Sequence, residues 1–141
     1  MPKYVDYHLF MHIFQYIDYF KMAAKRDANL DGEAQEWIES VLEEKFPAGV
    51  AYDDAIKDGI ILCKLMNKLS PGSVAKITTK GGAFALRANI ELFNKAARSY
   101  GVSDNELFQT VDLFEKKNIA QVTLAIHALG RIVRCYEFSF K

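Results

Sequence analysis

Apolar residues recur at helical spacing along most of the chain from residue 33 onward. Side chains three and four positions apart share one face of a helix, so such stripes predict amphipathic helices. Segment 74–79 contains some β-branched residues, but no second strand-like run accompanies it. The pattern therefore predicts an all-α fold. Its four clearest stripes are Ala34, Trp37, Ile38, Val41 and Leu42; Leu62, Leu65, Met66 and Leu69; Leu86, Ile90, Phe93, Ala97 and Tyr100; and Ile119, Val122, Ile126, Leu129 and Val133.

Helix-breaking residues predict where these helices end. The first is expected to end at Phe46, Pro47 and Gly49, and the second at residues 70–72, because proline cannot continue the hydrogen-bond ladder. A long loop, from residue 73 to about 83, is expected between the second and third main helices. Gly101 stands where a left-handed C-terminal cap is expected.

Two capping patterns predict the remaining helices. Ser103 and Glu106 have the spacing of a capping box and predict a short fourth helix. Asn118 and Gln121 have the same spacing and are expected to begin the last helix. The short helix would carry Leu107, Phe108, Val111 and Phe114.

Composition and charge narrow the class of protein. The 141 residues fit one domain, and 50% of them are hydrophobic, which suits a chain with a buried core. A net charge of zero disfavours nucleic acid as the main partner. Cys63 and Cys135 lie in apolar helical patterns and are expected to be reduced, with Cys63 buried and inert. Polar residues interrupt the aromatic segment 1–20, so neither a transmembrane segment nor a signal peptide is expected, and the sequence predicts a cytoplasmic protein.

One motif carries a resemblance to a known family. In segment 58–72, Asp-Gly precedes a leucine-rich helix that ends at Asn-x-Leu-x-Pro-Gly, and this pattern resembles the calponin homology domain. Segments 33–39, 108–117 and 128–131 resemble other parts of that domain. The resemblance is greatest to transgelins, calponins and related insect muscle proteins, and it assigns residues 21–141 to one domain, with 1–20 outside it. The residues that carry the fold signature are Trp37, Asp58, Gly59, Leu62, Leu65, Asn67, Leu69, Pro71 and Gly130.

The resemblance implies a compact orthogonal helical bundle that binds other proteins and is not an enzyme. Actin filaments or actin-associated regulatory proteins are the implied partners, the protein is expected to be a monomer associated with the cytoskeleton, and no cofactor is expected. Within the fold, Trp37 is expected to be buried, and Asp58 to cap its helix. Gly59 and Gly130 are expected to allow neighbouring segments to approach closely.

Two departures from the family leave an alternative open. Calponins and transgelins carry short repeats after this domain, implicated in calponins in actin binding, and none follows here before Lys141. Segment 1–20 also differs from the basic segment that usually precedes the domain. The alternative function is therefore a scaffold or signalling adaptor that does not bind actin directly.

A second alternative is weak calcium binding. Asp27, Asn29, Asp31 and Gly32 match the first six positions of an EF-hand loop, but Ile38 replaces the bidentate glutamate expected at position twelve. The favoured interpretation is that the three polar residues cap a helix beginning near Glu33.

Other candidate sites are weaker. His8 and His12 would share a helix face, but two ligands do not complete a zinc site. The sequence contains no nucleophile elbow and no phosphate-binding loop. Lys116 and Lys117 are candidate contacts for an acidic partner such as actin, against the alternative of a solvated surface. Segment 4–20 has three interpretations: it packs on the domain, lies on a partner or membrane surface, or is disordered.

Overall fold

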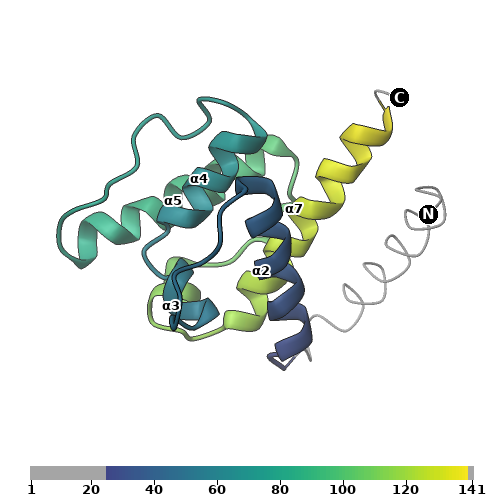
Figure 1. Cartoon of the computed structure of the whole chain (residues 1–141). Helices are drawn as coiled ribbons and strands as arrows, with labels where there is room; N and C mark the ends of the chain where they lie inside the picture. The colour runs from purple at the N-terminus through teal and green to yellow at the C-terminus, as the bar shows by residue number, and fades with distance from the viewer. Residues whose placement is uncertain (1–24, 140–141) are drawn as a thin grey trace.

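The computed structural model describes residues 25–139, and these contain helices but no strand, which confirms the all-α prediction (Figure 1). Segment 1–20, including His8 and His12, lies outside the described residues. The elements are α2 (Ala28–Leu42), α3 (Tyr52–Ile56), α4 (Ile60–Leu69), α5 (Ala83–Tyr100), the 3₁₀ helix η2 (Asp104–Glu106), α6 (Thr110–Phe114) and α7 (Ile119–Ser139).

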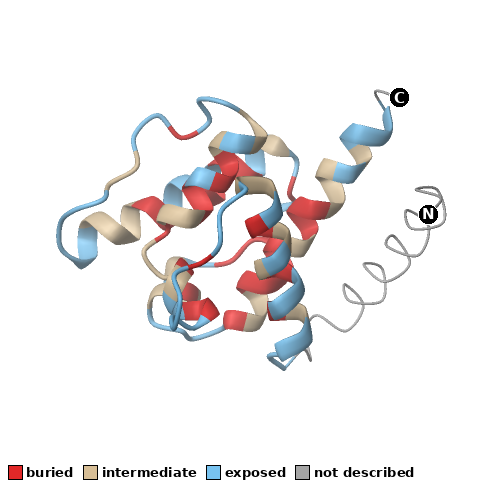
Figure 2. Ribbon diagram, in the orientation of Figure 1, coloured by how far each residue is buried: buried red, intermediate tan, exposed pale blue. Residues whose placement is uncertain are grey.

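The four long helices enclose a single core. Helix α4 packs along α5, while α2 packs against both α4 and α7. Figure 2 shows the buried residues concentrated in α4, the middle of α5 and the first part of α7. The last turns of α7 extend beyond the bundle and are largely exposed (Figures 1 and 2). All four predicted stripes contribute to this core, with Leu62, Leu65, Phe93 and Leu129 fully buried.

Helix α2 begins at Ala28, five residues before the predicted start near Glu33. Asp27 is its N-cap, and the Asp27 carboxylate accepts hydrogen bonds from the backbone N–H groups of Asn29 (2.8 Å) and Leu30 (3.3 Å). Asp27 therefore caps the helix, as predicted, but Asn29 and Asp31 lie inside it. The periodicity missed this turn because it is mostly polar and starts before the apolar stripe.

The end of α2 also differs from the prediction. The helix stops at Leu42, and Glu43 adopts the left-handed conformation with φ 55°. The chain then turns back, and the backbone N–H of Phe46 donates a hydrogen bond of 2.7 Å to the buried carboxylate of Glu39. Phe46 packs near Tyr52, with ring centroids 6.5 Å apart. Phe46 is thus a core residue of the connection to α3.

This contact makes the stability of the fold depend on Glu39. The hydrogen bond from Phe46 holds the pKa of Glu39 below its ordinary value of 4.5, with a further contribution from Lys45. A lowered pKa means that the ionised carboxylate stabilises the fold above pH 4.5, and that this contribution is lost as pH falls through the lower pKa of the folded state.

We therefore expect Glu39→Gln to lower the free energy of unfolding at pH 7, and the difference from wild type to shrink on acidification. Urea unfolding at a series of pH values between 7 and 3 measures it. The exposed Glu36→Gln on the same helix is the matched control and should stay close to wild type. A Glu39→Gln difference that is constant across this range would contradict the assignment.

The Asp58-Gly59 pair forms the turn into α4. The Asp58 carboxylate accepts a hydrogen bond from the backbone N–H of Ile60 at 3.0 Å, which confirms its predicted role. Gly59 has φ +75°, and a Cβ atom placed there would lie 2.8 Å from Asn89 Cβ and 3.0 Å from Ile90 N. The predicted close approach at Gly59 is therefore confirmed: α5 passes where any larger residue would have its side chain.

Two asparagines hold the long loop between α4 and α5. The side chain of Asn67 bonds both the N–H (2.8 Å) and the C=O (3.0 Å) of Val74. Asn89 does the same for Thr78, at 2.9 and 2.7 Å, and also donates to the C=O of Asp58 at 3.1 Å. Because each amide replaces the partner that a neighbouring strand would supply, the loop can run along the outside of the bundle without regular structure. This gives signature residue Asn67 a structural role.

The predicted fourth helix is divided into η2 and α6. Ser103 Oγ donates to the side chains of Asn105 and Glu106, at 2.6 and 2.7 Å, instead of accepting a hydrogen bond from the backbone. The helix stops after one turn because the backbone becomes extended at Leu107, and α6 starts afresh where the N–H of Gln109 donates to Asp112. Asn118 caps α7 as expected, since it accepts a hydrogen bond from the N–H of Gln121.

Trp37 is only partly buried, which corrects the prediction of a buried tryptophan. Its ring packs on Gly130, where a Cβ atom would lie 3.6 Å from the nearest ring carbon. That distance is an ordinary van der Waals contact, so the approach at Gly130 is less restrictive than at Gly59. Trp37 covers the junction of α2 and α7 at the edge of the core.

Candidate functional site

The residues that match the start of a calcium-binding loop form a network of hydrogen bonds within the fold instead. Asp31 is buried, and its carboxylate accepts hydrogen bonds from Thr123 Oγ1 at 2.7 Å and from Arg26 Nε at 2.8 Å. The Thr123 hydroxyl is also paired with the buried hydroxyl of Tyr52 at 2.9 Å. Asp27 caps α2, so residues 27–32 form a helical turn instead of an open loop. In the region 25–139, no group of three or more His, Cys, Asp or Glu side chains is arranged to hold a metal ion.

The same network contains Lys116. Its ammonium lies 3.2 Å from the Asp53 carboxylate and also pairs with Asp54, while Arg26 contacts Asp53 at 3.4 Å. Burial raises the pKa of Asp53, but the hydrogen bonds from Lys116 and Arg26 outweigh burial and leave this pKa below its ordinary value. Lys116 therefore ties α3 to the turn after α6. Lys117, the other predicted contact residue, is exposed.

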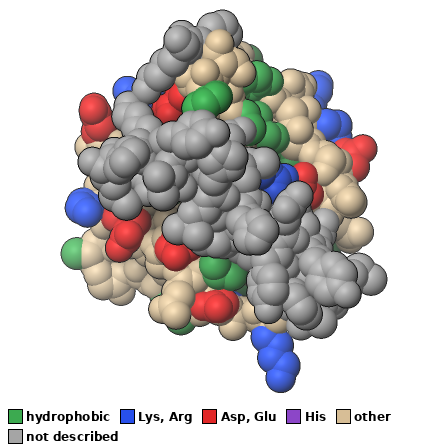
Figure 3. Space-filling view, turned by 90° about the vertical axis from the view of Figure 1, so that its right-hand side faces the viewer, with side chains coloured by type: hydrophobic (Ala, Val, Ile, Leu, Met, Phe, Trp, Pro, Cys, Tyr) green, Lys and Arg blue, Asp and Glu red, His purple; other side chains and the backbone are tan. Residues whose placement is uncertain are grey.

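Three arginines are also paired with carboxylates. Arg98 forms an ion pair with Asp104, Arg131 with Glu106, and Arg87 lies 3.6 Å from Glu115. On the part of the surface visible in Figure 3, acidic and basic side chains are intermingled instead of gathered by sign. Arg87 and Arg98 thus belong to a mixed, solvated surface, whereas the pair of Arg131 with Glu106 is mostly buried.

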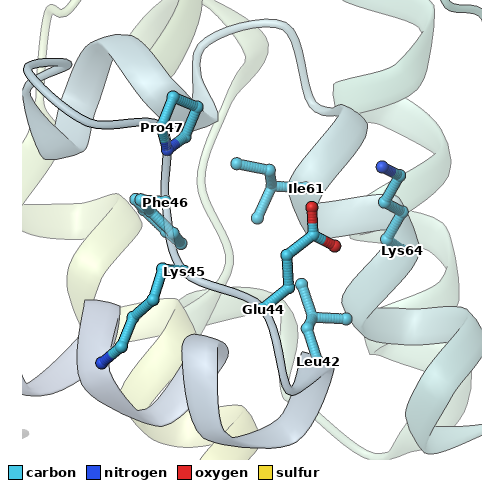
Figure 4. A pocket seen from close by; sticks show the side chains of 7 residues that line it. All are labelled: Leu42, Glu44, Lys45, Phe46, Pro47, Ile61 and Lys64. Carbon is cyan, nitrogen blue, oxygen red and sulfur yellow. The ribbon is translucent and has the colours of Figure 1, made fainter.

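One small pocket lies between the end of α2 and α4. It has a volume of about 270 Å³ and is lined by Leu42, Glu44, Lys45, Phe46, Pro47, Ile61 and Lys64 (Figure 4). Its lining includes no thiol, hydroxyl or imidazole side chain that could act as a nucleophile beside a base. Cys63 lies elsewhere, fully buried, with its thiol 3.2 Å from the C=O of Asn89. The predicted burial of Cys63 is thus confirmed, and burial raises the pKa of this thiol to about 12, which disfavours the reactive thiolate.

The fold and these features agree with a known domain. The family model of the calponin homology (CH) domain matches residues 28–135, which is most of the chain. The chain belongs to the calponin homology domain family. The matched region covers all of α2 to α6 and most of α7, including the turn at Gly59 and both asparagine clamps of the long loop.

Two relatives are similar to this calponin homology domain over most of the chain. The chain is 57% identical over 111 residues to Muscle-specific protein 20 of Drosophila melanogaster. The matched region covers 79% of this chain and 60% of that protein. It is 48% identical over 121 residues to Myophilin of Echinococcus granulosus, covering 84% of the chain and 64% of that protein. The chain thus spans less than two thirds of these relatives. These similarities confirm the resemblance to the transgelin and calponin group.

A solved structure has the same fold. The calponin-homology domain of Rng2 from Schizosaccharomyces pombe superposes with a TM-score of 0.70 at 26% sequence identity, over 77% of this chain and 69% of that one. Proteins of the transgelin and calponin group are structural components of the cytoskeleton and not enzymes, so family membership places this chain among non-enzymatic proteins. Within residues 25–139, no helix is both long and apolar enough to cross a membrane.

Phe84 and Phe114 were not among the contact residues predicted from the sequence. Phe84 is 91% exposed in the first turn of α5 and belongs to no core stripe. Phe114 is partly buried against the core, and the cations of Arg87 and Lys57 lie over its ring, at 4.8 and 5.2 Å from its centroid. The signal for Phe84 was available, because a large aromatic residue off the apolar face of a helix is exposed by default.

Proposed function

We propose that the chain is an actin-associated binding module of the muscle cytoskeleton. The observation that carries this proposal is its 57% identity to Muscle-specific protein 20 over 79% of the chain, within a calponin homology fold. The chemistry of the described surface supports a binding role, because several ionisable groups form ion pairs between elements and none of the described groups forms a catalytic arrangement in the pocket. The module would act by equilibrium association and contribute to the organisation of filaments or the regulation of contraction.

The two lysines after α6 would have different roles in this function. Lys116 is held by Asp53 and Asp54, so its charge stabilises the fold. Lys117 is exposed and is the cation that would meet an acidic filament. Separate substitutions of Lys116 and Lys117 therefore distinguish an effect on the stability of the fold from an effect on binding.

Cosedimentation with filamentous actin tests the proposal. We expect the wild-type chain to pellet with filaments at low salt and less at moderate salt, because the attraction between exposed charges is screened. Lys117→Glu should weaken pelleting several-fold, whereas Lys68→Glu, an exposed lysine on α4, should not. Lys116→Met should lower the free energy of unfolding in urea. Absence of wild-type pelleting at both salt concentrations would overturn direct actin binding.

A scaffold or adaptor role is the second candidate. The pairing of Arg98, Arg131 and Lys116 within the fold favours it, since these three charges are then less available to an acidic filament. A pull-down from muscle extract distinguishes the two functions. Recovery of adaptors or kinases without actin supports the scaffold, and recovery of actin by purified chain supports the first function.

A further inference from the structure

Four side chains from α5 and α6, with Lys57 from the turn after α3, form what we call the α5–α6 surface: Lys57, Phe84, Arg87, Val111 and Phe114. Phe84 and Arg87 are three residues apart on α5, and Val111 and Phe114 are three apart on α6, so each pair shares a helix face. Phe84 is 91% exposed and Val111 is 37% exposed. Figure 2 shows the first turn of α5 at the outer edge of the bundle, away from the core.

The charges of this surface are held in place by the Phe114 ring. The guanidinium of Arg87 and the ammonium of Lys57 both lie over that ring, and such contacts restrict long, flexible side chains. Arg87 has one loose ion pair, at 3.6 Å from its Nη2 atom to Glu115, while its Nε atom is buried. The Arg87 side chain is 41% exposed, and its two terminal nitrogens retain N–H donors for a carboxylate from another molecule.

This combination contributes little to folding. Phe84 buries almost none of its ring, and an aromatic residue left in water gains nothing from the hydrophobic effect. Aromatic residues and arginine are, however, the residue types enriched in protein interfaces and in their binding hot spots. The five residues include two cations and no carboxylate, with Glu115 at the edge. The surface is therefore matched to an acidic partner that also presents an apolar group.

We propose that the α5–α6 surface docks a protein segment in which an apolar side chain lies between carboxylates. The apolar side chain packs on Phe84 and Val111, while the carboxylates pair with Arg87 and Lys57. This proposal rests on the proposed function in one respect, that the partner is a protein. It does not require that the partner be actin.

An NMR titration tests this docking surface without filaments. The ¹⁵N-labelled chain is titrated with the peptide acetyl-Asp-Asp-Phe-Asp-Asp-amide, and with the same peptide carrying asparagine in place of aspartate. We expect amide shifts to cluster at Phe84, Arg87 and Phe114 with the acidic peptide only. Arg87→Glu should weaken binding by about tenfold or more, as expected for loss of a hot-spot arginine. Lys95→Glu, an exposed lysine two turns further along α5, is the matched control and should change affinity less than twofold.

Several outcomes would overturn the docking surface: no shifts up to the solubility limit of the peptide, shifts centred elsewhere, equal binding of the neutral peptide, or full binding by Arg87→Glu. Thermal unfolding of each variant shows that it is folded, and Phe84→Ala provides a second variant that removes no charge. If the peptide binds here but filaments do not pellet with the chain, the actin proposal fails and the surface stands. If filaments pellet equally with wild type and Arg87→Glu and the peptide shifts nothing, the surface alone fails.

Discussion

Replacing Gly59 by alanine should lower the free energy of unfolding by about 3 kcal/mol, from left-handed backbone strain together with overpacking. Gly59 has φ +75°, a conformation in which an L-residue meets its own carbonyl oxygen. The added methyl group would also lie 2.8 Å from Asn89 Cβ and 3.0 Å from backbone Ile90 N, and a helix backbone cannot move aside as a flexible side chain can. Urea unfolding followed by far-UV circular dichroism measures the change.

Gly32 supplies the matched control for this substitution. It lies inside α2, and a Cβ atom placed there would meet nothing within 4 Å. Gly32→Ala should therefore stabilise the chain by up to about 1 kcal/mol, because alanine is the better helix former. If both substitutions changed the free energy of unfolding equally, the close approach of α5 to Gly59 would be refuted.

Phe93→Ala should destabilise the fold by about 3–5 kcal/mol, the range seen when a buried aromatic side chain is truncated. Phe93 is fully buried, and its ring packs near Phe108 with centroids 5.9 Å apart. The cavity left by the ring would open at the junction of α5 with the segment before α6. A loss of this size is a large fraction of the roughly 5–15 kcal/mol by which domains are typically stable. Thermal and urea unfolding measure the change.

Phe84→Ala is the control, since it removes the same ring from the same helix at a position 91% exposed. Its free energy of unfolding should stay within about 0.5 kcal/mol of wild type. A loss at Phe84 as large as the loss at Phe93 would show that the first turn of α5 is packed, which would also remove the basis for the α5–α6 surface.

The sequence predicted the long helices well, because their stability depends on stripes that periodicity detects. Helix α3, which the sequence analysis did not predict, spans only Tyr52–Ile56, too short for a stripe to appear. The start of α2 was placed late because Asp27 caps a polar turn. The fourth helix was joined wrongly because Ser103 has the spacing of a capping box while its hydroxyl bonds other side chains. A capping pattern in the sequence indicates which hydrogen bonds can form, and the tertiary contacts determine which of them do form.

The candidate site was less predictable, because it depends on contacts between distant parts of the chain. Lys116 meets Asp54 across 62 positions of sequence, so no local pattern could separate its role from that of Lys117. Asp31 likewise pairs with Thr123 across 92 positions, which removed it from the open loop that the calcium-like spacing suggested. The positions of Arg87 and Lys57 over Phe114 required the packing of α5 against α6.

The central claim is that the outer surface of the bundle binds actin filaments while the core stays unchanged. Hydrogen–deuterium exchange of the chain with and without filamentous actin tests this claim most directly. The account predicts slower exchange on filament addition in the first turns of α5 and in the segment from α6 to Lys117, with the buried amides of α4 unchanged. Exchange that filaments leave unaltered throughout the chain, or protection confined to α4 and the loop after it, would contradict it.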